Sequence, residues 1–410
     1  MTEDVAEKEV ERQLAVIHQG AEAVLGEEEL REKLRAFVRG GSPLRVKLGV
    51  DPSAPDLHLG HTVVIQKLKR FQELGHTPIF LIGDFTARIG DPSGKKKTRP
   101  SLAPELIRKN AQTYLDQVGR VLDVQRAEIR FNSEWMEPMS SSDFIRLCSH
   151  YTVARLLERD DFAKRYAAGE PIAGHEFLYP FVQAYDSVAL RCDVELGGSD
   201  QRFNLLMARE IQRAFGQAPQ AVAIHPLLVG TEGRDKMSKS LGNTIGIQDP
   251  PEEIYGKIMS LSDALMLTYL ERLGFGDWED LEPARQAVAQ GGGDPLTLKH
   301  ELARRLVERF YGAAAGKAAA DHFRQVVQRK EVPDDLSEKA IALGGESEIG
   351  LLDLLERLAL IQSRGEGRRL IAEGAIQVDG ARVSDPTLRL REGAYLMRVG
   401  RRRYARVRLS

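Results

Sequence analysis

Residues 44–61 read LRVKLGVDPSAPDLHLGH. The apolar run at 44–50 predicts a strand, and the helical spacing of apolar residues at 62–74 predicts an amphipathic helix. The loop between them contains a glycine, which lets a ligand lie close to the backbone. Because the first N–H groups of a helix point outward and carry partial positive charge, this strand–loop–helix unit favours a phosphate-bearing ligand.

Strands and helices continue to alternate along residues 43–230. Further strands are predicted at 77–82, 128–131, 189–196 and 223–228, and further helices at 103–122 and 201–215. This alternation predicts the α/β class, with a Rossmann-like parallel sheet between two layers of helices. Ligands of such sheets bind beyond the carboxyl ends of the strands, so we expect the site there.

The chain is long enough for several domains. Its pattern becomes helical after about residue 249, and a segment of linker composition follows. The predicted organisation is an N-terminal helical segment at 1–40 with helices at 6–25 and 28–37, an α/β domain at 41–248, a helical domain at 249–330, a linker at 331–346 and a small α+β domain at 347–410.

The last sixty residues, 351–410, are basic. They contain 13 arginines, no lysine and 7 acidic residues, which is a net charge of +6 against −2 for the whole chain. A basic end on an acidic body is typical of a contact with nucleic acid.

Composition excludes several other classes. Two isolated cysteines, Cys148 and Cys192, have no C-x-x-C spacing, so they form neither a zinc site nor a disulfide framework and indicate a reducing compartment. The acidic N-terminus is unlike a signal peptide, and no apolar run is long enough to span a bilayer. We therefore expect a cytoplasmic protein without a membrane partner.

Two short motifs contain residues suited to phosphate chemistry. His58 and His61 flank a glycine at the predicted helix start, where imidazole N–H groups can donate to phosphate oxygens. The string GRDKMSKSLG predicts a flexible loop whose Lys236 and Lys239 can neutralise a leaving polyphosphate. Taken separately, the first motif is also compatible with a polar turn and the second with a solvated loop.

Together the two motifs resemble those of a known family. The string HLGH resembles the HIGH motif of class I aminoacyl-tRNA synthetases, and KMSKS at 236–240 matches their second motif letter for letter. The resemblance implies ATP with Mg²⁺ as a substrate complex, and neither a bound prosthetic group nor a metal site formed by protein ligands. The implied catalytic residues are His58, His61, Lys236 and Lys239, and the implied ATP contacts include Gly60 and Lys239.

A third stretch indicates the amino acid. Residues 179–186 read YPFVQAYD and resemble the tyrosine-binding helix of tyrosyl-tRNA synthetases. At the helical spacing i, i+4 and i+7, Tyr179, Gln183 and Asp186 share one face. The resemblance implies that Tyr179 and Gln183 hold the substrate ammonium and that Asp186 accepts a hydrogen bond from its phenol. A half-buried amphipathic helix is the alternative.

Further strings, GGSDQ, GDPSGK and FNSEW, resemble segments of the same family. The implied ATP contacts are Gly198 and Asp200, the implied tyrosine contacts are Asp91, Asn132 and Gln201, and the implied catalytic residues on a basic loop near pyrophosphate are Lys95 and Arg99. The alternatives are a solvated lysine run at 95–97 and an Asx turn at Asn132.

The basic C-terminus resembles the small RNA-binding domain that these enzymes share with a small-subunit ribosomal protein, on the strings SRGEGRRLI and GARVSDP. The arginines Arg364, Arg368 and Arg369 are then expected to contact tRNA phosphates, and the helical domain at 249–330 is expected to bind tRNA as well. A solvated amphipathic helix is the alternative for the arginines.

Nearly the whole chain, apart from about forty N-terminal residues, resembles bacterial tyrosyl-tRNA synthetases. The resemblance implies a homodimeric tyrosine–tRNA ligase that forms tyrosyl-adenylate and pyrophosphate from tyrosine and ATP, then transfers tyrosyl to the terminal ribose of tRNA(Tyr). The alternatives are a tryptophanyl-tRNA synthetase, a cofactor adenylyltransferase and a non-catalytic RNA-binding derivative of the fold. One departure is Lys47, where many members have a tyrosine that reaches the substrate phenol; the second phenol contact beside Asp186 therefore stays open.

Overall fold

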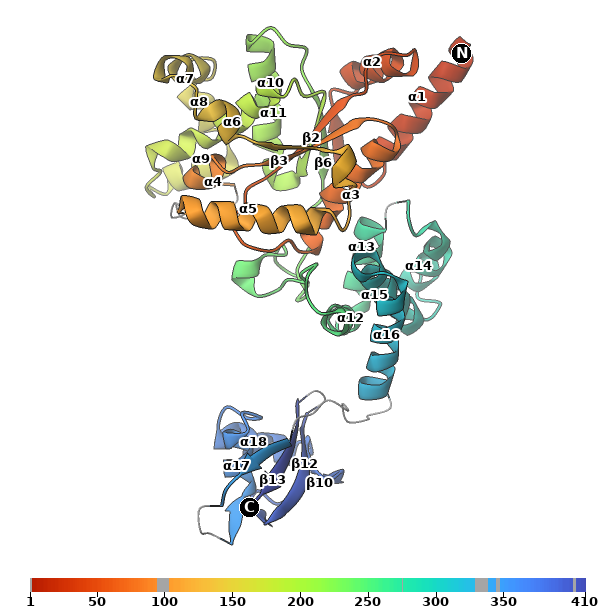
Figure 1. The fold of residues 1–410 in the computed structure, drawn as a ribbon, viewed down its shortest axis with the longest axis vertical. Coiled ribbons are helices and arrows are strands. Elements are labelled where there is room, and N and C mark those ends of the chain that lie inside the picture. Colours follow the sequence, from red (N-terminus) through yellow and green to blue (C-terminus); the bar gives the residue numbers. More distant parts are fainter. Residues whose placement is uncertain (1, 94–102, 275, 329–337, 344–346, 401–402) are drawn as a thin grey trace. The chain divides into compact units, whose positions relative to one another are not determined.

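The computed structural model describes residues 2–93, 103–274, 276–328, 338–343, 347–400 and 403–410. The chain divides into two compact units, 1–316 and 317–410 (Figure 1). Among the described residues, none of the helices combines the length and the apolar character needed to cross a membrane.

A six-stranded sheet forms the centre of the first unit. Its order is β1-β6-β5-β2-β3-β4, and all neighbours are parallel except β1 and β6, so the predicted parallel sheet is confirmed. The strands are β1 (Ala23–Leu25), β2 (Arg45–Val50), β3 (Thr77–Ile82), β4 (Glu128–Phe131), β5 (Val194–Gly198) and β6 (Ala221–His225).

The helix predicted at 6–25 is wrong at its end. Helix α1 (Glu3–His18) stops earlier, Gly20 turns the chain with a φ of 70°, and β1 pairs antiparallel with β6. Pairing at the sheet edge gives the backbone of these three apolar residues the hydrogen-bond partners that a longer helix would have supplied.

The strand predicted at 189–196 is wrong in its first half. Helix α10 (Tyr179–Ala189) includes its first residue, Arg191 turns the chain with a φ of 47°, and β5 begins only at Val194. An apolar run that ends a buried helix and begins a buried strand has no periodicity that separates the two.

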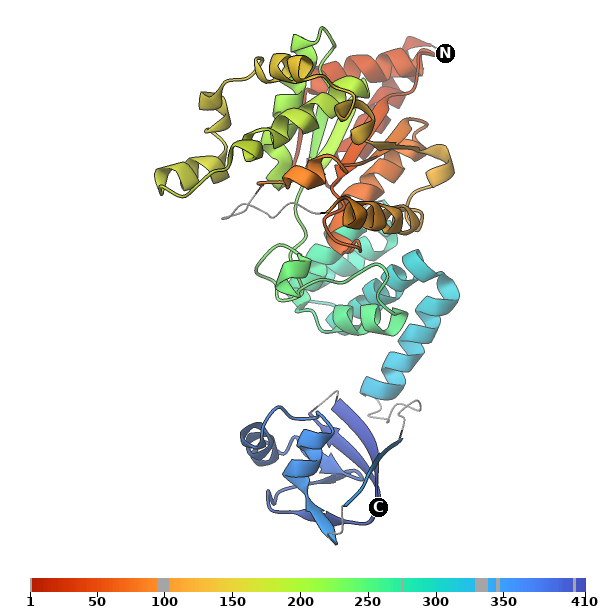
Figure 2. The same ribbon diagram turned by 60° about the vertical axis from the view of Figure 1, so that its left-hand side comes forward.

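Helices cover both faces of this sheet. Figures 1 and 2 show α1 and α3 on one face and α10 and α11 on the other. The longer helices are α1, α2 (Glu27–Val38), α3 (Leu59–Glu73), α5 (Pro104–Val118), α10 and α11 (Arg202–Ala214). The shorter ones are α4 (Thr86–Ile89), η1 (Val124–Arg126), α6 (Ser133–Met136), α7 (Ser141–Cys148), α8 (Val153–Leu156), α9 (Asp160–Ala167), η2 (Gly174–Phe177), η3 (Ser199–Gln201) and η4 (Lys239–Leu241).

The described chain between residues 250 and 328 is helical, as predicted. Its elements are α12 (Pro251–Met259), α13 (Asp263–Leu273), η5 (Glu279–Leu281), α14 (Glu282–Ala289), α15 (Pro295–Tyr311), α16 (Ala313–Phe323) and the π-helix η6 (Arg324–Gln328). The apolar residues of α15 at helical spacing are buried: Leu302, Ala303, Leu306, Val307 and Phe310.

The second unit is a small α+β fold with its own core of buried apolar side chains. A five-stranded sheet has the order β10-β9-β12-β13-β7, and β11 pairs with β8. Its elements are β7 (Glu338–Ile341), β8 (Glu348–Gly350), α17 (Leu351–Arg357), α18 (Arg364–Ala372), β9 (Ile376–Val378), β10 (Ala381–Arg382), β11 (Arg389–Arg391), β12 (Gly393–Val399) and β13 (Arg403–Leu409).

The sheet of the second unit begins inside the segment predicted as a linker. Strand β7 pairs in parallel with β13, which places residues 338–341 in the fold. Residues 329–337 and 344–346 lie outside the described residues.

Candidate active site

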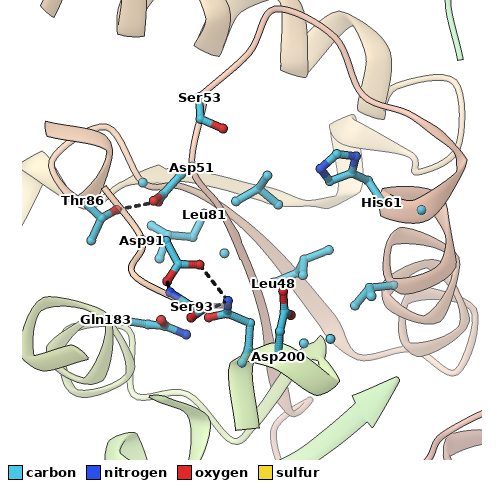
Figure 3. Close-up of a pocket in the computed structure, with 18 of the residues that line it drawn as sticks. Leu48, Asp51, Ser53, His61, Leu81, Thr86, Asp91, Ser93, Gln183 and Asp200 are labelled. Atoms are coloured by element: carbon cyan, nitrogen blue, oxygen red, sulfur yellow. Dashed lines mark hydrogen bonds between the residues drawn. The ribbon is translucent and has the colours of Figure 1, made fainter. Parts of the chain in front are cut away.

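A pocket of about 650 Å³ lies beyond the carboxyl ends of β2, β3 and β5 (Figure 3). Asp51 follows β2, Gly83 follows β3 and Gly198 ends β5, and all three line the pocket. The sequence predicted a ligand site at this edge of the sheet, because parallel sheets bind their ligands there.

The pocket gathers most of the residues predicted to bind ATP or tyrosine. Its lining includes His58, Gly60, His61, Asp91, Tyr179, Gln183, Asp186, Gly198, Asp200, Gln201, Lys236 and Lys239. Lys95 and Arg99 lie outside the described residues.

The two histidines have fixed tautomers. The backbone N–H of Gly60 donates to Nδ1 of His58 at 3.2 Å, and the backbone N–H of His58 donates to Nδ1 of His61 at 3.2 Å. Each ring therefore carries its proton on Nε2 and can donate from there. Burial lowers the pKa of His61 to about 4 and that of His58 further, with the charges of Lys236 and Lys239 adding to the effect, so both rings are neutral donors at neutral pH.

Gly60 lies close to the ring of His58. A Cβ at residue 60 would lie 3.0 Å from the His58 ring, which is tighter than ordinary van der Waals contact. A side chain there would require the imidazole to move by a few tenths of an ångström.

Two acidic side chains hold the lysine ammonium groups in the pocket. Lys236 Nζ lies 2.8 Å from an oxygen of Asp200, and Lys239 Nζ donates to Asp56. The lysine side chains are 36% and 31% exposed. Both lysine side chains are therefore partly exposed to solvent. A triphosphate that enters the pocket can replace the two carboxylates as the partner of the ammonium groups.

One face of α10 forms the opposite side of the pocket. Tyr179, Gln183 and Asp186 all line it, which confirms the shared face predicted from their spacing. The Tyr179 hydroxyl donates to Asp51 at 2.9 Å, and Thr86 donates to the other oxygen of Asp51 at 2.7 Å. These bonds fix the phenol ring of Tyr179 against the end of β2.

Asp186 is 2% exposed and is held by two donors. Trp135 Nε1 donates to it at 2.9 Å and Asn132 Nδ2 at 3.4 Å. Asn132 also donates to Thr86 and is fully buried. Asn132 does not line the pocket, so it holds Asp186 in place through this hydrogen bond without facing the pocket itself. Burial raises the pKa of Asp186 to about 7, against the opposing charge of Lys47 and the two hydrogen bonds.

A second polar group gathers around Asp91. The backbone N–H of Ser93 donates to one oxygen of Asp91 at 2.8 Å (Figure 3). Gln201 Nε2 donates to the other oxygen at 2.9 Å. Asn204 donates to the side-chain oxygens of both Gln183 and Gln201. The pocket thus has one pole rich in amide and carboxylate oxygens, suited to an ammonium, and a separate buried carboxylate at Asp186.

Comparisons with known proteins identify the family. A family model described as tRNA synthetases class I (W and Y) matches residues 39–328, and one described as S4 domain matches residues 349–394. The chain is 52% identical to the tyrosine–tRNA ligase of Syntrophotalea carbinolica, over 98% of each chain. It is 49% identical to that of Geobacter sulfurreducens, over 96% of this chain and 98% of the relative. The chain belongs to the tyrosine–tRNA ligase family.

Solved structures of tyrosyl-tRNA synthetases are similar in fold to this member of the tyrosine–tRNA ligase family. The tyrosyl-tRNA synthetase from Archaeoglobus fulgidus, complexed with L-tyrosine, has a TM-score of 0.62 and 26% identity, covering 76% of this chain and 99% of that chain. A truncated mitochondrial tyrosyl-tRNA synthetase from Coccidioides posadasii has a TM-score of 0.63 at 23% identity, covering 78% of this chain and 94% of that chain. The second likeness concerns the fold alone.

The arginines of this synthetase that were predicted to contact tRNA lie on α18 of the second unit. Arg364, Arg368 and Arg369 are all exposed. Arg364 lies 2.5 Å from Asp353, and Arg369 lies 3.7 Å from Glu373. Solvated ion pairs of this kind are weak, so phosphates can replace the carboxylates.

Sequence reasoning about this synthetase missed Asp51, Asp56, Trp135 and Glu195. Asp51 and Asp56 lie in the loop between β2 and α3, where their place after a strand was the available signal. Trp135 and Glu195 gave no local signal, because only the tertiary fold brings them to Asp186 and Lys47.

Within the described ranges, no three His, Cys, Asp or Glu side chains gather into a cluster that could hold a metal ion.

Proposed function

We propose that this chain is a tyrosine–tRNA ligase, which activates tyrosine with ATP and then transfers the tyrosyl group to tRNA(Tyr). One observation carries the proposal. One pocket contains two parts. The first is the face of α10 with the buried acceptor Asp186. The second, the phosphate pole, consists of the neutral imidazoles of His58 and His61 and the ammonium groups of Lys236 and Lys239. The full-length similarity to curated tyrosine–tRNA ligases supports it, and disfavours the tryptophanyl alternative and a non-catalytic role.

In the first step, the tyrosine carboxylate attacks the α-phosphorus of ATP, forming the mixed anhydride and releasing pyrophosphate. The pocket supplies position and charge and needs no protein nucleophile. Tyr179, Gln183 and Asp91 hold the ammonium, Gln201 orients the carboxylate, and Asp186 accepts the phenol. Gly60, Gly198 and Asp200 contact the nucleotide. We propose that Mg²⁺ enters with ATP as part of the substrate.

Charge grows on the phosphate oxygens as pyrophosphate leaves. The Nε2–H groups of His58 and His61 and the ammonium groups of Lys236 and Lys239 are the donors for that charge. Lys95 and Arg99 are proposed to assist from the basic loop predicted at 95–99. The ribose hydroxyl at the end of tRNA then attacks the anhydride, while Arg364, Arg368 and Arg369 hold the tRNA backbone.

Replacing His61 by alanine is expected to slow tyrosyl-adenylate formation by roughly tenfold or more, because a donor to the transition state is lost. Single-turnover kinetics of adenylate formation measure this rate. Tyrosine affinity, measured separately by calorimetry, should stay within about twofold because His61 serves the phosphate pole. An unchanged rate of adenylate formation would remove His61 from the catalytic set.

The direct test of the ligase function is charging of tRNA(Tyr) with radiolabelled tyrosine in the presence of ATP and Mg²⁺. We expect acid-stable tyrosyl-tRNA to accumulate, and no charging of tRNA(Trp) with tryptophan. Charging with tryptophan in preference to tyrosine would replace the proposal by its nearest alternative.

We also propose that the chain forms a homodimer through helices α7 to α9 of the first unit, and that it acts in the cytoplasm. Ile145, Val153 and Tyr166 are 70%, 61% and 69% exposed. Leu147 and Leu156 on two of these helices face inward, into a core shared with α10 and α11. Large exposed apolar side chains that flank a packed core are typical of an interface. Both cysteines are free thiols, which supports a reducing compartment.

The double variant Ile145→Asp, Tyr166→Asp is expected to sediment as a monomer at micromolar concentration, where the unmodified chain sediments as a dimer, because two charges would be buried at the interface. Analytical ultracentrifugation measures the mass. Leu296→Asp on α15, which replaces a 52% exposed apolar residue elsewhere, is the matched control and should stay dimeric. A double variant that remains dimeric places the interface on another surface.

A further inference from the structure

Asn204 on α11 is a buried amide behind the pocket. It is 1% exposed and does not line the pocket, whereas Gln183 and Gln201, which it bonds, both do. Its Nδ2 donates to Gln183 Oε1 at 2.9 Å and to Gln201 Oε1 at 3.1 Å. One nitrogen therefore holds together the amide oxygens of two glutamines that come from different segments of the chain, α10 and η3.

The orientation of the Asn204 amide is set by Arg159, the residue before α9. Arg159 Nη1 donates to Asn204 Oδ1 at 3.2 Å. A guanidinium has N–H donors and no acceptor, so the oxygen of Asn204 must face it and the NH2 group must face the glutamines. The reverse orientation would place an NH2 group against the guanidinium and an oxygen against the two glutamine oxygens.

Arg159 is itself held in the interior. It is 5% exposed, and its Nη2 donates to Ser93 Oγ at 2.6 Å. Its Nε lies 2.7 Å from Asp161, and Nη2 lies 3.7 Å from Asp91. A planar guanidinium that is bonded on several sides keeps one orientation, so the oxygen of Asn204 meets its donor at a fixed place.

Carboxylates hold the other ends of the two glutamine amides. Gln201 Nε2 donates to Asp91 at 2.9 Å, and Gln183 Nε2 donates to Glu195 at 3.4 Å. An ionised carboxylate only accepts, so each glutamine turns its nitrogen to a carboxylate and its oxygen to Asn204. The direction of every bond in this network therefore follows from the guanidinium at its centre and the carboxylates at its ends.

This arrangement suits a primary ammonium. An amide oxygen accepts two hydrogen bonds, and the bond from Asn204 uses one acceptor site on each glutamine oxygen. An ammonium has three N–H donors and no acceptor, so two amide oxygens in the wall of the pocket are matching partners for it. An NH2 group in the place of either oxygen would repel it.

We propose that Asn204, oriented by Arg159, is a positioning residue that holds the amide oxygens of Gln183 and Gln201 for the substrate ammonium. Through these oxygens it makes the pocket select amino acids over analogues that lack the amino group. The inference rests on the proposed tyrosine–tRNA ligase function. Without the NH2 group of Asn204, each glutamine amide can turn over and present its own NH2 group, so the substrate loses both acceptors together.

Asn204→Leu tests this role, because leucine is similar in size and has neither donor nor acceptor. Arg159 keeps its bonds to Ser93 and Asp161 in this variant. We expect the affinity for tyrosine, measured by calorimetry, to fall by roughly tenfold or more. The inhibition constant of 3-(4-hydroxyphenyl)propionate, which is tyrosine without its amino group, should stay within about twofold in ATP–pyrophosphate exchange.

The ratio of kcat/KM for tyrosine to that for phenylalanine separates this role from a merely structural one. Both substrates carry the same ammonium, so we expect Asn204→Leu to keep the ratio within about twofold. A general disturbance of α10 would also move Asp186 and would lower the ratio. Gln72→Leu is the matched control, since it removes a buried amide on α3 that bonds the backbone of Asp123, and it should leave tyrosine affinity unchanged.

If Asn204→Leu does not fold, as judged by its thermal melt, Asn204→Ala removes the same amide without placing a bulky group in the interior, and the same losses are expected. The inference is overturned if a folded Asn204 variant keeps the tyrosine affinity of the unmodified chain, or if it loses affinity for the analogue by the same factor as for tyrosine. Absence of tyrosine-dependent exchange in the unmodified chain would instead overturn the proposed function.

Discussion

Asp186→Ala is expected to weaken tyrosine binding by roughly a hundredfold or more. Hydrogen bonds to charged groups contribute about 1.5–3 kcal/mol, and removing this acceptor also leaves the substrate hydroxyl without its partner at a buried position. The loss is large because Asp186 is 2% exposed, so water cannot readily replace the carboxylate. Trp135 Nε1 and the Asn132 amide would lose their acceptor too.

Isothermal titration calorimetry with tyrosine measures this loss. Asp186→Asn is the matched variant, since it keeps the volume and one acceptor oxygen for Trp135 but not the charge, and it should bind tyrosine with intermediate affinity. Phenylalanine binding should change much less than tyrosine binding in the alanine variant. An Asp186→Ala chain that binds tyrosine with the affinity of the unmodified chain would refute the role given to α10.

Removal of residues 338–410 is expected to reduce charging of tRNA by on the order of a hundredfold, while tyrosine-dependent pyrophosphate exchange stays within about twofold. The second unit has its own apolar core and the basic α18, whereas the pocket is lined by the first unit alone. Phosphate contacts dominate affinity for nucleic acid, so the loss concerns tRNA and not the adenylate. The cut precedes β7, because a cut at 346 would leave that strand without β13.

A triple variant with Arg364, Arg368 and Arg369 changed to glutamine provides the finer comparison. The second unit of this variant should stay folded, and its tRNA binding should be weaker. The slope of the logarithm of the binding constant against the logarithm of salt concentration should fall by the equivalent of up to about three phosphate contacts. Filter-binding at several salt concentrations gives the slope. Normal charging by the truncated chain would mean that the second unit is dispensable for tRNA recognition.

The arrangement of the site residues could be predicted where those residues lie on a single helix or on one strand–loop–helix unit. The face of α10 follows from the spacing of Tyr179, Gln183 and Asp186, and His58 and His61 at the start of α3 follow from one strand–loop–helix unit. The parallel sheet followed from alternation alone.

Contacts between distant segments could not be read from the sequence. Trp135 and Asp186 are joined only in the folded chain, as are Lys47 and Glu195 on neighbouring strands. The sequence therefore marked Lys47 as a departure without indicating its partner. The edge strand β1 was mistaken for the end of a helix, and the end of α10 for the start of β5, because helices and strands share apolar content and short runs show too little periodicity to separate them.

The central claim is that one pocket binds tyrosine and ATP together and joins them. ATP–pyrophosphate exchange, measured on the full chain with each of the twenty amino acids in turn, tests it most directly. We predict exchange that depends on tyrosine, with phenylalanine and tryptophan supporting at most a small fraction of the rate. Exchange supported equally by another amino acid, or none with tyrosine, would contradict it.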